Sequence, residues 1–526
     1  MAFAFPSGLV PSSLFAIAVV SMLPAQTRLA RVFGDHMVLQ RDQPVRIHGH
    51  AAPGERVVVR FAEQELAAVA AADGAFEVTL APLAAAMQGR ELTVTGAQTV
   101  RLVDVVVGDV WLCSGQSNMA WTLGGCDASD DVASADLPAV RYRPYFEHFA
   151  GEPQDDLREG AAWRALSKDT ARDCVAVGFY FARAVQPAAG VPIGLLTCTV
   201  GGTEIECWMP PAAFREFPAN RAIGEARSRR IAEWQQALAA AVPKVEQWAL
   251  AAKAAVAANA VIPAPPRLPG HPNEDRSNWH RTQSLYNGMV HPLTRFPVRG
   301  VLWYQGESNG HEQASYVQKF TAMVATWRRL WGSELPFYFV QLANYERASD
   351  DPAGGNGFAP CRMAQLLCMQ LPRTGMAVAI DVGEANDIHP RNKFDVGVRL
   401  ARFALANEYG QQLDPSGPLF SRCERQGNAL RVHFDHASEG LMVGRKRGRA
   451  PVAEAAGEAL GGFAVAGEDK QWHHATARID GASVIVHSEA VPQPVAVRYA
   501  YRANPVGANL YDRDGLPASP FRSDDW

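Results

Sequence analysis

The stretch VVVGDVWLCSGQSNM, residues 105–119, decides the fold that the rest of the sequence supports. It begins with branched apolar residues, as in a strand buried on both faces of a parallel sheet. It ends in small and polar residues around Ser117, and such a turn holds a hydroxyl exposed at the carboxyl end of a strand. If a helix follows, its free N–H groups point back at that hydroxyl and stabilise an oxyanion. The alternative is that Ser117 merely caps a helix, and this stretch alone favours neither.

The composition is typical of a globular enzyme. A chain of 526 residues is too long for one ordinary domain, so we expect about two to four. Hydrophobic residues make up 48% of the chain and 35 prolines interrupt it, unlike a disordered sequence. Because the net charge of −4 is small for this length, it gives no electrostatic reason to expect nucleic acid or a membrane as partner.

The N-terminus carries an apolar run, LFAIAVVSML at residues 14–23. Its length fits a signal peptide over residues 1–26 and is too short to span a membrane. No Lys or Arg precedes Arg28, which is atypical, so a segment that simply packs on the protein is the alternative. We predict a periplasmic or secreted protein.

The eight cysteines indicate no metal site. None forms a C-x-x-C pair, and no His/Cys spacing resembles a zinc site. Cys113, Cys198 and Cys207 lie in or beside apolar stretches, where buried free thiols are common. We predict no metal and no cofactor, while disulfide pairing and oligomeric state stay open.

Three domains are expected. Residues 27–103 alternate apolar and polar residues between turns such as Pro53-Gly54 and Asp73-Gly74, which predicts a small β-sandwich. Residues 104–410 alternate strand and helix patterns with long connections, which predicts parallel pairing in an α/β/α sandwich. Residues 411–526 return to short β patterns and predict a second sandwich-like domain. The strand and helix patterns of the middle domain are Val105–Cys113, Ile193–Val200, Val298–Tyr304, Phe337–Leu342 and Ala377–Asp381, and Ala176–Val185, Val317–Leu330, Met363–Gln370 and Lys393–Glu408.

An insertion interrupts the middle domain at residues 211–282. Its Ala-rich part, residues 222–260, predicts a helical hairpin, and the proline-rich segment 261–273 predicts an extended connector. The insertion either rims a substrate site or covers a hydrophobic flank, and the sequence favours neither.

Three later stretches repeat the pattern of a strand that opens into small and polar residues. Gly201-Gly202-Thr203 follows one strand, and paired glycines let backbone N–H groups approach a ligand. Gln305, Glu307 and Asn309 follow another. His389 lies between a strand and a helix that starts after Pro390, and is a candidate general base for Ser117. Each stretch alone is explained equally well as a tight turn, a solvated loop or a surface histidine. Their repetition at the ends of strands in one sheet makes a chance pattern less plausible.

The four stretches together resemble the SGNH/GDSL hydrolase superfamily, and within it the sialate O-acetylesterase-like carbohydrate esterases. The resemblance covers nearly the whole chain and rests on several motifs in order. They are VFGDHMVLQRDQPVRIHG at 32–49, GQSNM at 115–119, GGTEIECW at 201–208, LYNGMVHPL at 285–293, WYQGESN at 303–309, NDIHPRNK at 386–393 and NLYDRDGLPASPFR at 509–522.

The resemblance implies a role for each matching position. Ser117 matches the nucleophile that attacks the acetyl carbonyl of a sugar ester, and His389 the base that takes its proton. The oxyanion would bind the Ser117 N–H, a glycine N–H at Gly201 or Gly202, and a side-chain donor. The superfamily uses an asparagine there, and the matching turn offers Gln305 or Asn309. These roles describe a metal-independent serine esterase that forms an acetyl-serine intermediate.

The acid of the triad departs from the family pattern. The superfamily has Asp-x-x-His, but the position three residues before His389 is Asn386, and Asp387 lies only two before. An asparagine cannot stabilise an imidazolium as a carboxylate does. We therefore expect Asp387 to serve, with a Ser–His dyad as the alternative.

The substrate is the least determined part. Residues flanking the proposed centre that could stack on or hydrogen-bond a sugar are Gln116, Trp121, Tyr304 and Glu307, with Trp208 nearby; core packing is the alternative for each tryptophan. Members of the group act on O-acetyl sialic acids or on acetylated plant polysaccharides such as xyloglucan and xylan. A non-catalytic glycan-binding relative, and a lipase or thioesterase of the same superfamily, are further hypotheses.

Overall fold

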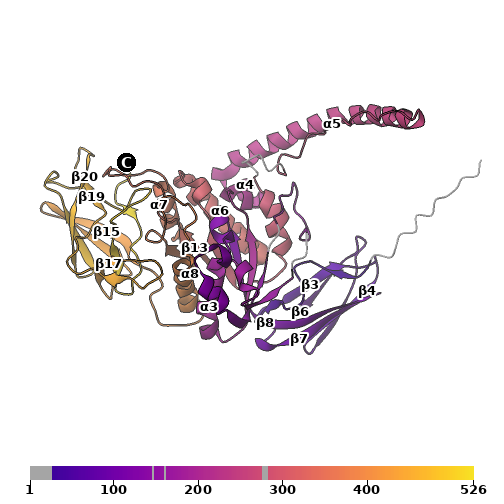
Figure 1. Ribbon diagram of the computed structural model, residues 1–526, viewed down its shortest axis with the longest axis horizontal. Helices are drawn as coiled ribbons and strands as arrows, with labels where there is room; N and C mark the ends of the chain where they lie inside the picture. The colour runs from indigo at the N-terminus through magenta and orange to yellow at the C-terminus, as the bar shows by residue number, and fades with distance from the viewer. Residues whose placement is uncertain (1–25, 145–146, 159–161, 275–281) are drawn as a thin grey trace, which may run out of the picture.

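The computed structural model describes residues 26–144, 147–158, 162–274 and 282–526. Apart from Gln26, the predicted signal peptide lies outside these ranges. Figure 1 shows N-terminal strands at one end, alternating strands and helices in the middle, and C-terminal strands at the other end. In the described part of the chain, no helix is both long and apolar enough to cross a membrane.

The longest strand is β8 (Thr99–Gly115), which contains most of the opening stretch. Its first half alternates in exposure and pairs antiparallel with β7 (Ala86–Thr95). From residue 105 onward every residue is buried, and this half pairs in parallel with β11 (Ile193–Thr199) and β12 (Gly300–Tyr304). The predicted limit between residues 103 and 104 therefore falls inside one continuous strand.

The central sheet has the strand order β10-β9-β11-β8-β12-β13-β14. Its neighbours from β9 to β14 pair in parallel, and β10 pairs antiparallel at the edge. The strands expected from apolar runs are present, although β14 lies three residues before the predicted Ala377–Asp381, whereas β9 and β10 were not predicted. The bounds not yet given are β9 (Asp136–Arg143), β10 (Arg164–Ser167), β13 (Phe337–Gln341) and β14 (Thr374–Val378).

Helices cover both faces of this sheet. The rings of Trp111 and Tyr338 point to one face, where they contact α3 and α8. The rings of Trp303 and Phe337 point to the opposite face, where they contact α6. The helix α7 packs on α6. The bounds are α3 (Ala176–Ala189), α6 (Ala314–Trp331), α7 (Ala359–Cys368) and α8 (Lys393–Asn407).

The strand order reverses at β8. From β8 the chain passes to β9 and β11 on one side of it, and then to β12, β13 and β14 on the other. In an open parallel sheet, ligands bind outside the carboxyl ends of the strands at such a reversal. Ser117 lies two residues beyond the end of β8, so the topology puts it at this point.

The flanking units are built from short strands. At the N-terminus one sheet has the order β1-β3-β6, while β4, β5 and β7 continue the central sheet beyond β8. The C-terminal unit has three sheets, β15-β16-β22-β21, β18-β17-β24 and β20-β19-β23-β25, around its own apolar core. The bounds are β1 (Arg28–Leu29), β2 (Val38–Gln40), β3 (Val45–His50), β4 (Arg56–Phe61), β5 (Gln64–Val69), β6 (Ala75–Leu80), β15 (Leu419–Gln426), β16 (Ala429–Asp435), β17 (Leu441–Arg445), β18 (Ala453–Glu454), β19 (Phe463–Ala466), β20 (Trp472–His474), β21 (Thr476–Asp480), β22 (Ser483–His487), β23 (Ala496–Tyr499), β24 (Leu510–Asp512) and β25 (Phe521–Arg522).

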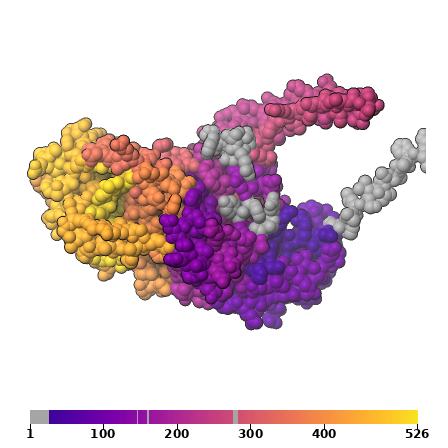
Figure 2. Space-filling model, viewed as in Figure 1, coloured from indigo at the N-terminus to yellow at the C-terminus, as the bar shows by residue number. Residues whose placement is uncertain are grey.

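The insertion differs from the predicted helical hairpin. It contains one long helix, α5 (Arg221–Ala257), which projects from the body of the molecule (Figure 2). The return arm is extended because prolines dominate it, and the indole N–H groups of Trp248 and Trp234 fasten it to α5 by donating to the carbonyls of Pro263 and Pro269. The hairpin thus has a single helical arm.

Candidate active site

Ser117 opens the short helix α1 (Ser117–Ala120), and Gln116 occupies the cap position before it. Gly115 makes this turn possible, since its φ is +132° and a Cβ there would lie 2.2 Å from the carbonyl oxygen of Tyr304. Only a glycine lets β8 and β12 come this close together. The Ser117 hydroxyl is therefore not a helix cap, and it lies free to meet a partner from another loop.

That partner is His389. The Nε2 atom of His389 lies 2.8 Å from Ser117 Oγ, although the two residues are 272 positions apart. His389 comes from the loop between β14 and α8. The indole of Trp121 stacks on the imidazole, with ring centres 4.7 Å apart and planes 15° from parallel. Trp121, predicted as a substrate contact, thus lies where it holds the orientation of the imidazole.

Asp387 lies on the other side of the imidazole. Its Oδ1 accepts the backbone N–H of His389 at 2.8 Å and lies 3.6 Å from His389 Nδ1. This separation suits an ion pair but exceeds a hydrogen bond. The Asp387 side chain is 41% exposed, so solvent weakens its attraction for the ring. Among the described residues, Asp387 is the carboxylate that pairs with His389.

The pKa of His389 lies below its ordinary value. Partial burial lowers the pKa most, and the nearby ammonium of Lys393 lowers it further, while Asp387 acts against both. The imidazole is therefore neutral at pH 7, and its Nε2 can accept the Ser117 proton.

A buried chain of polar groups lies under this pair. The ammonium of Lys393 donates to Asn118 Oδ1 at 2.5 Å, and the Asn118 amide donates to Glu307 Oε1 at 2.5 Å and to the carbonyl of Ile388 at 3.0 Å. Asn118 thereby ties the turn after β8 to the residue before His389. Burial lowers the pKa of Lys393 to about 8 and raises that of Glu307, and each opposes the other's shift. Sequence reasoning missed Asn118 and Lys393, although both lie inside the quoted motifs.

Backbone donors surround the hydroxyl. A Cβ built on Gly201 would lie 3.2 Å from Ser117 Cβ, so this glycine brings the loop after β11 against the serine. Gly202 has a φ of +66°, which favours glycine. Within the described chain, the N–H groups of Ser117, Gly201 and Gly202 donate to no protein acceptor. These groups are open to an oxyanion formed at the serine.

The two predicted side-chain donors are instead engaged within the protein. Gln305 is fully buried, and its amide nitrogen donates to the Thr203 carbonyl at 3.1 Å and to Asn309 Oδ1 at 2.7 Å. The Asn309 amide nitrogen donates to Glu206 at 3.2 Å and to Glu312 at 3.0 Å. In this arrangement both N–H bonds of each amide are already used within the protein.

The remaining predicted contacts lie beneath the surface. Tyr304 is fully buried under the ammonium of Lys393, 5.6 Å from its ring centre, and offers no surface to a substrate. Trp208 is likewise fully buried, as its core-packing alternative required. Gln116 is 3% exposed, and its Oε1 faces the N–H groups of Gly306 and Ser308 at 3.4 Å each.

Neither a metal site nor a disulfide is seen in the parts that the structure describes. No group of three or more His, Cys, Asp or Glu side chains is arranged to hold an ion. All eight cysteines are free thiols, and burial raises the pKa of Cys113 to about 12.

Known proteins resemble this chain over most of its length. The family model for carbohydrate esterase, sialic acid-specific acetylesterase, matches residues 107–239 and 273–406. A sialate O-acetylesterase of Mus musculus is 30% identical over 465 residues, 80% of this chain and 81% of the relative, and one of Homo sapiens is 29% identical, over 76% and 74%. A solved carbohydrate acetylesterase from Xanthomonas citri is 36% identical, with a TM-score of 0.77, over 95% of this chain and 100% of its own.

These similarities show that the chain is a carboxylic ester hydrolase that acts on carbohydrates. Within this class it belongs to the family of sialic acid-specific acetylesterases. Membership of this family supports the removal of O-acetyl groups from sugars as the reaction.

Proposed function

We propose that the protein removes O-acetyl groups from carbohydrates through an acetyl-serine intermediate on Ser117. The observation that carries this proposal is the 2.8 Å contact between Ser117 Oγ and His389 Nε2 at the carboxyl edge of the sheet. We also propose that the middle unit is of the SGNH type. Ser117, Gly201, the 305–309 turn and His389 follow β8, β11, β12 and β14, which is the arrangement this superfamily requires.

The reaction follows from the geometry. Ser117 Oγ attacks the acetyl carbon while its proton moves to His389 Nε2. The tetrahedral intermediate then collapses, its bond to the sugar oxygen breaks, and that oxygen takes the proton from Nε2. Water attacks the acetyl-serine in the second half, His389 accepts a proton from the water, and acetate leaves as the serine oxygen is reprotonated.

The oxyanion of both intermediates is stabilised by the open N–H groups of Ser117 and of Gly201 or Gly202. Removing one oxyanion donor typically costs about 10²–10³ in rate. The amides of Gln305 and Asn309 support the same turn; either could serve as a third donor after exchanging an internal hydrogen bond. Asp387 stabilises the imidazolium that forms between the steps.

A direct test compares the wild type with Ser117→Ala on p-nitrophenyl acetate. We expect the variant to lose at least about 10⁴-fold in kcat and to show no acetylated protein by mass spectrometry after rapid quenching. Ser308→Ala, an exposed serine in the neighbouring turn, is the matched control and is expected to retain activity. Undiminished turnover by Ser117→Ala would end the proposal.

For the glycan, we propose O-acetylated sialic acid as the first choice. Support comes from the family model and from the relatives named sialate O-acetylesterase. Acetylated plant oligosaccharides such as those of xylan and xyloglucan are the alternative. Acetate release from matched panels of sialosides and plant oligosaccharides distinguishes them, because the preferred glycan gives the higher kcat/KM.

We propose further that the protein is exported. The apolar run at residues 14–23 supports this, since its length fits a signal peptide. Mass spectrometry of the N-terminus of protein from the producing cells tests it. Export predicts a mature chain that starts near residue 27, and an intact Met1 would contradict it.

A further inference from the structure

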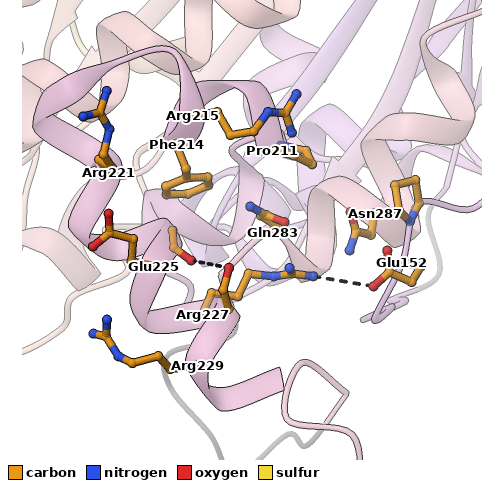
Figure 3. A pocket seen from close by; sticks show the side chains of 13 residues that line it. Glu152, Pro211, Phe214, Arg215, Arg221, Glu225, Arg227, Arg229, Gln283 and Asn287 are labelled. Carbon is orange, nitrogen blue, oxygen red and sulfur yellow. Dashed lines mark hydrogen bonds and ion pairs between the residues drawn. The ribbon is translucent and has the colours of Figure 1, made fainter. Parts of the chain in front are cut away.

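A hollow of about 770 Å³ lies apart from Ser117, where the first turns of α5 meet α4 (Pro211–Arg215). Figure 3 shows arginine side chains around the ring of Phe214, with Gln283 and Asn287 on the opposing wall. Neither Ser117 nor His389 lines this hollow, which we call the α4–α5 cavity. Its volume suits a small ligand such as one or two sugar residues.

The charge of the α4–α5 cavity is opposite to that of the whole chain. Four arginines line it against two glutamates, whereas the protein carries a net charge of −4. Among the described residues, no carboxylate forms an ion pair with Arg215, Arg221 or Arg229. Arg227 is held in place, because it donates to the carbonyl of Gly151 at 3.1 Å. The cavity therefore presents guanidinium groups that an anion can pair with.

The opposing wall supplies polar groups of another kind. Gln283 is 4% exposed, and its side-chain amide has no hydrogen-bond partner among the described residues. Asn287 is fully buried; its nitrogen donates to the carbonyls of Ala150 and Gly151, and its Oδ1 has no partner in the described part of the chain. Buried amides without partners are costly unless a ligand completes them. Exposed arginines with the amide of Gln283 beside them are suited to a sugar that carries an acid group.

The cavity and Ser117 share one loop. The backbone N–H of Gln283 donates to the carbonyl of Glu206 at 2.9 Å. Glu206 lies five residues beyond Gly201, which packs against Ser117, so their Cα atoms are at most about 18 Å apart. The loop after β11 therefore connects a wall of the α4–α5 cavity to the turn that carries Ser117.

We propose that the α4–α5 cavity is a second glycan-binding site that takes an anionic saccharide residue, carboxylated or sulfated. The exposed guanidinium groups of Arg215 and Arg221 bind the acid group, and the side-chain amide of Gln283 binds a hydroxyl. That the ligand is a saccharide rests on the proposed function, whereas its charge rests on the cavity itself. The site gives the insertion a role at the rim of the substrate path, one of the two alternatives that the sequence left open.

Calorimetry on the full chain with non-acetylated probes tests the proposal. The probes are trigalacturonic acid, which is carboxylated, a sulfated κ-carrageenan tetrasaccharide, and neutral maltotriose. The cavity variant is Arg215→Gln with Arg221→Gln, and the control is Arg46→Gln with Arg422→Gln, two exposed arginines on β3 and β15. Hydrolysis of p-nitrophenyl acetate, which reaches only Ser117, shows that each variant is folded.

We expect the wild type to bind one or both anionic probes more tightly than maltotriose. The cavity variant should raise that Kd at least about tenfold, since it removes two charge-assisted contacts, while the control leaves it unchanged. The proposal is overturned if the cavity variant binds as the control does, if neither anionic probe binds, or if maltotriose binds as tightly. Ser117→Ala should bind the probes normally, so a failure of the esterase proposal appears in acetate release and a failure of this one in binding.

Discussion

The two sides of the Ser117 hydroxyl are built differently. On one side the turn after β12 and the loop after β11 are joined by buried amides, with Gln305 and Asn309 bonded to each other and to neighbouring backbone. On the other side His389 stands on a partly exposed loop, held by one stacked indole, a backbone contact and a carboxylate at 3.6 Å. The amides on the first side hold the geometry and do not titrate, while the second side carries His389, which is placed to exchange a proton with Ser117.

The largest expected effect comes from removing the imidazole. His389→Gln keeps an amide in its place but cannot take the serine proton, so kcat should fall at least about 10⁴-fold. Single-turnover hydrolysis of p-nitrophenyl acetate measures the loss. His50→Gln on β3 is the control and should leave the rate unchanged; a loss of less than tenfold in His389→Gln would remove this residue from the mechanism.

Removing an amide from the side formed by Gln305 and Asn309 should chiefly lower the stability of the folded protein. Gln305→Met removes the donor to the Thr203 carbonyl and leaves Asn309 Oδ1 accepting from the backbone N–H of Ile205, which should lower the free energy of unfolding by about 1–3 kcal/mol. Urea unfolding followed by tryptophan fluorescence measures it. If stability is unchanged and only kcat falls, Gln305 acts as an oxyanion donor and not as part of the scaffold.

Removing the charge of Asp387 should have a moderate effect. We expect Asp387→Asn to lower kcat by roughly 10- to 100-fold, less than the about 10⁴-fold seen for a buried triad aspartate, because Asp387 is exposed and lies 3.6 Å from the ring. Asp387 raises the pKa of His389, so its loss should move the acid limb of the pH–rate profile to lower pH. A profile that does not move would favour the dyad.

The smallest expected effect on rate is a shift of the pH–rate profile in the direction opposite to that of Asp387→Asn. The Lys393 ammonium lowers the pKa of His389, so Lys393→Met should raise that pKa and move the acid limb to higher pH. The base must be neutral to act, and the variant therefore loses activity first in mildly acidic buffer. The pH dependence of kcat/KM measures this. Lys168→Met, an exposed lysine, should leave the profile in place, and equal shifts in both would point to a general charge effect.

Much of the fold was predictable because strands buried on both faces have little choice of residue. The apolar runs of β8, β11, β12 and β13 mark their positions to within a few residues. The strand β9 was missed because DLPAVRYR contains a proline and charged residues, which suit its place near the sheet edge. The return arm of the insertion has no periodicity, so the sequence could not show that it packs along α5.

For the site, the sequence predicted which residues would meet but not how amides and charges would be shared. Ser117 and His389 each lie within a recognisable motif, and the structure brings them together. Lys393 was missed because a lysine at a helix start ordinarily points to solvent, and only the packed structure shows that this one is buried. Asn118 was missed with it, because its role depends on the hydrogen bond that it accepts from Lys393. Likewise, only the packed structure shows that Tyr304 is buried.

The continuity of β8 has a consequence for protein engineering. Modules joined by a flexible linker can be exchanged by cutting between them, but a cut anywhere between residues 99 and 115 divides a single paired strand. A transplanted hydrolase unit must therefore carry β7 with it or receive another strand that pairs with the first half of β8. We expect chimaeras joined at a position before β7 to be recovered as soluble protein.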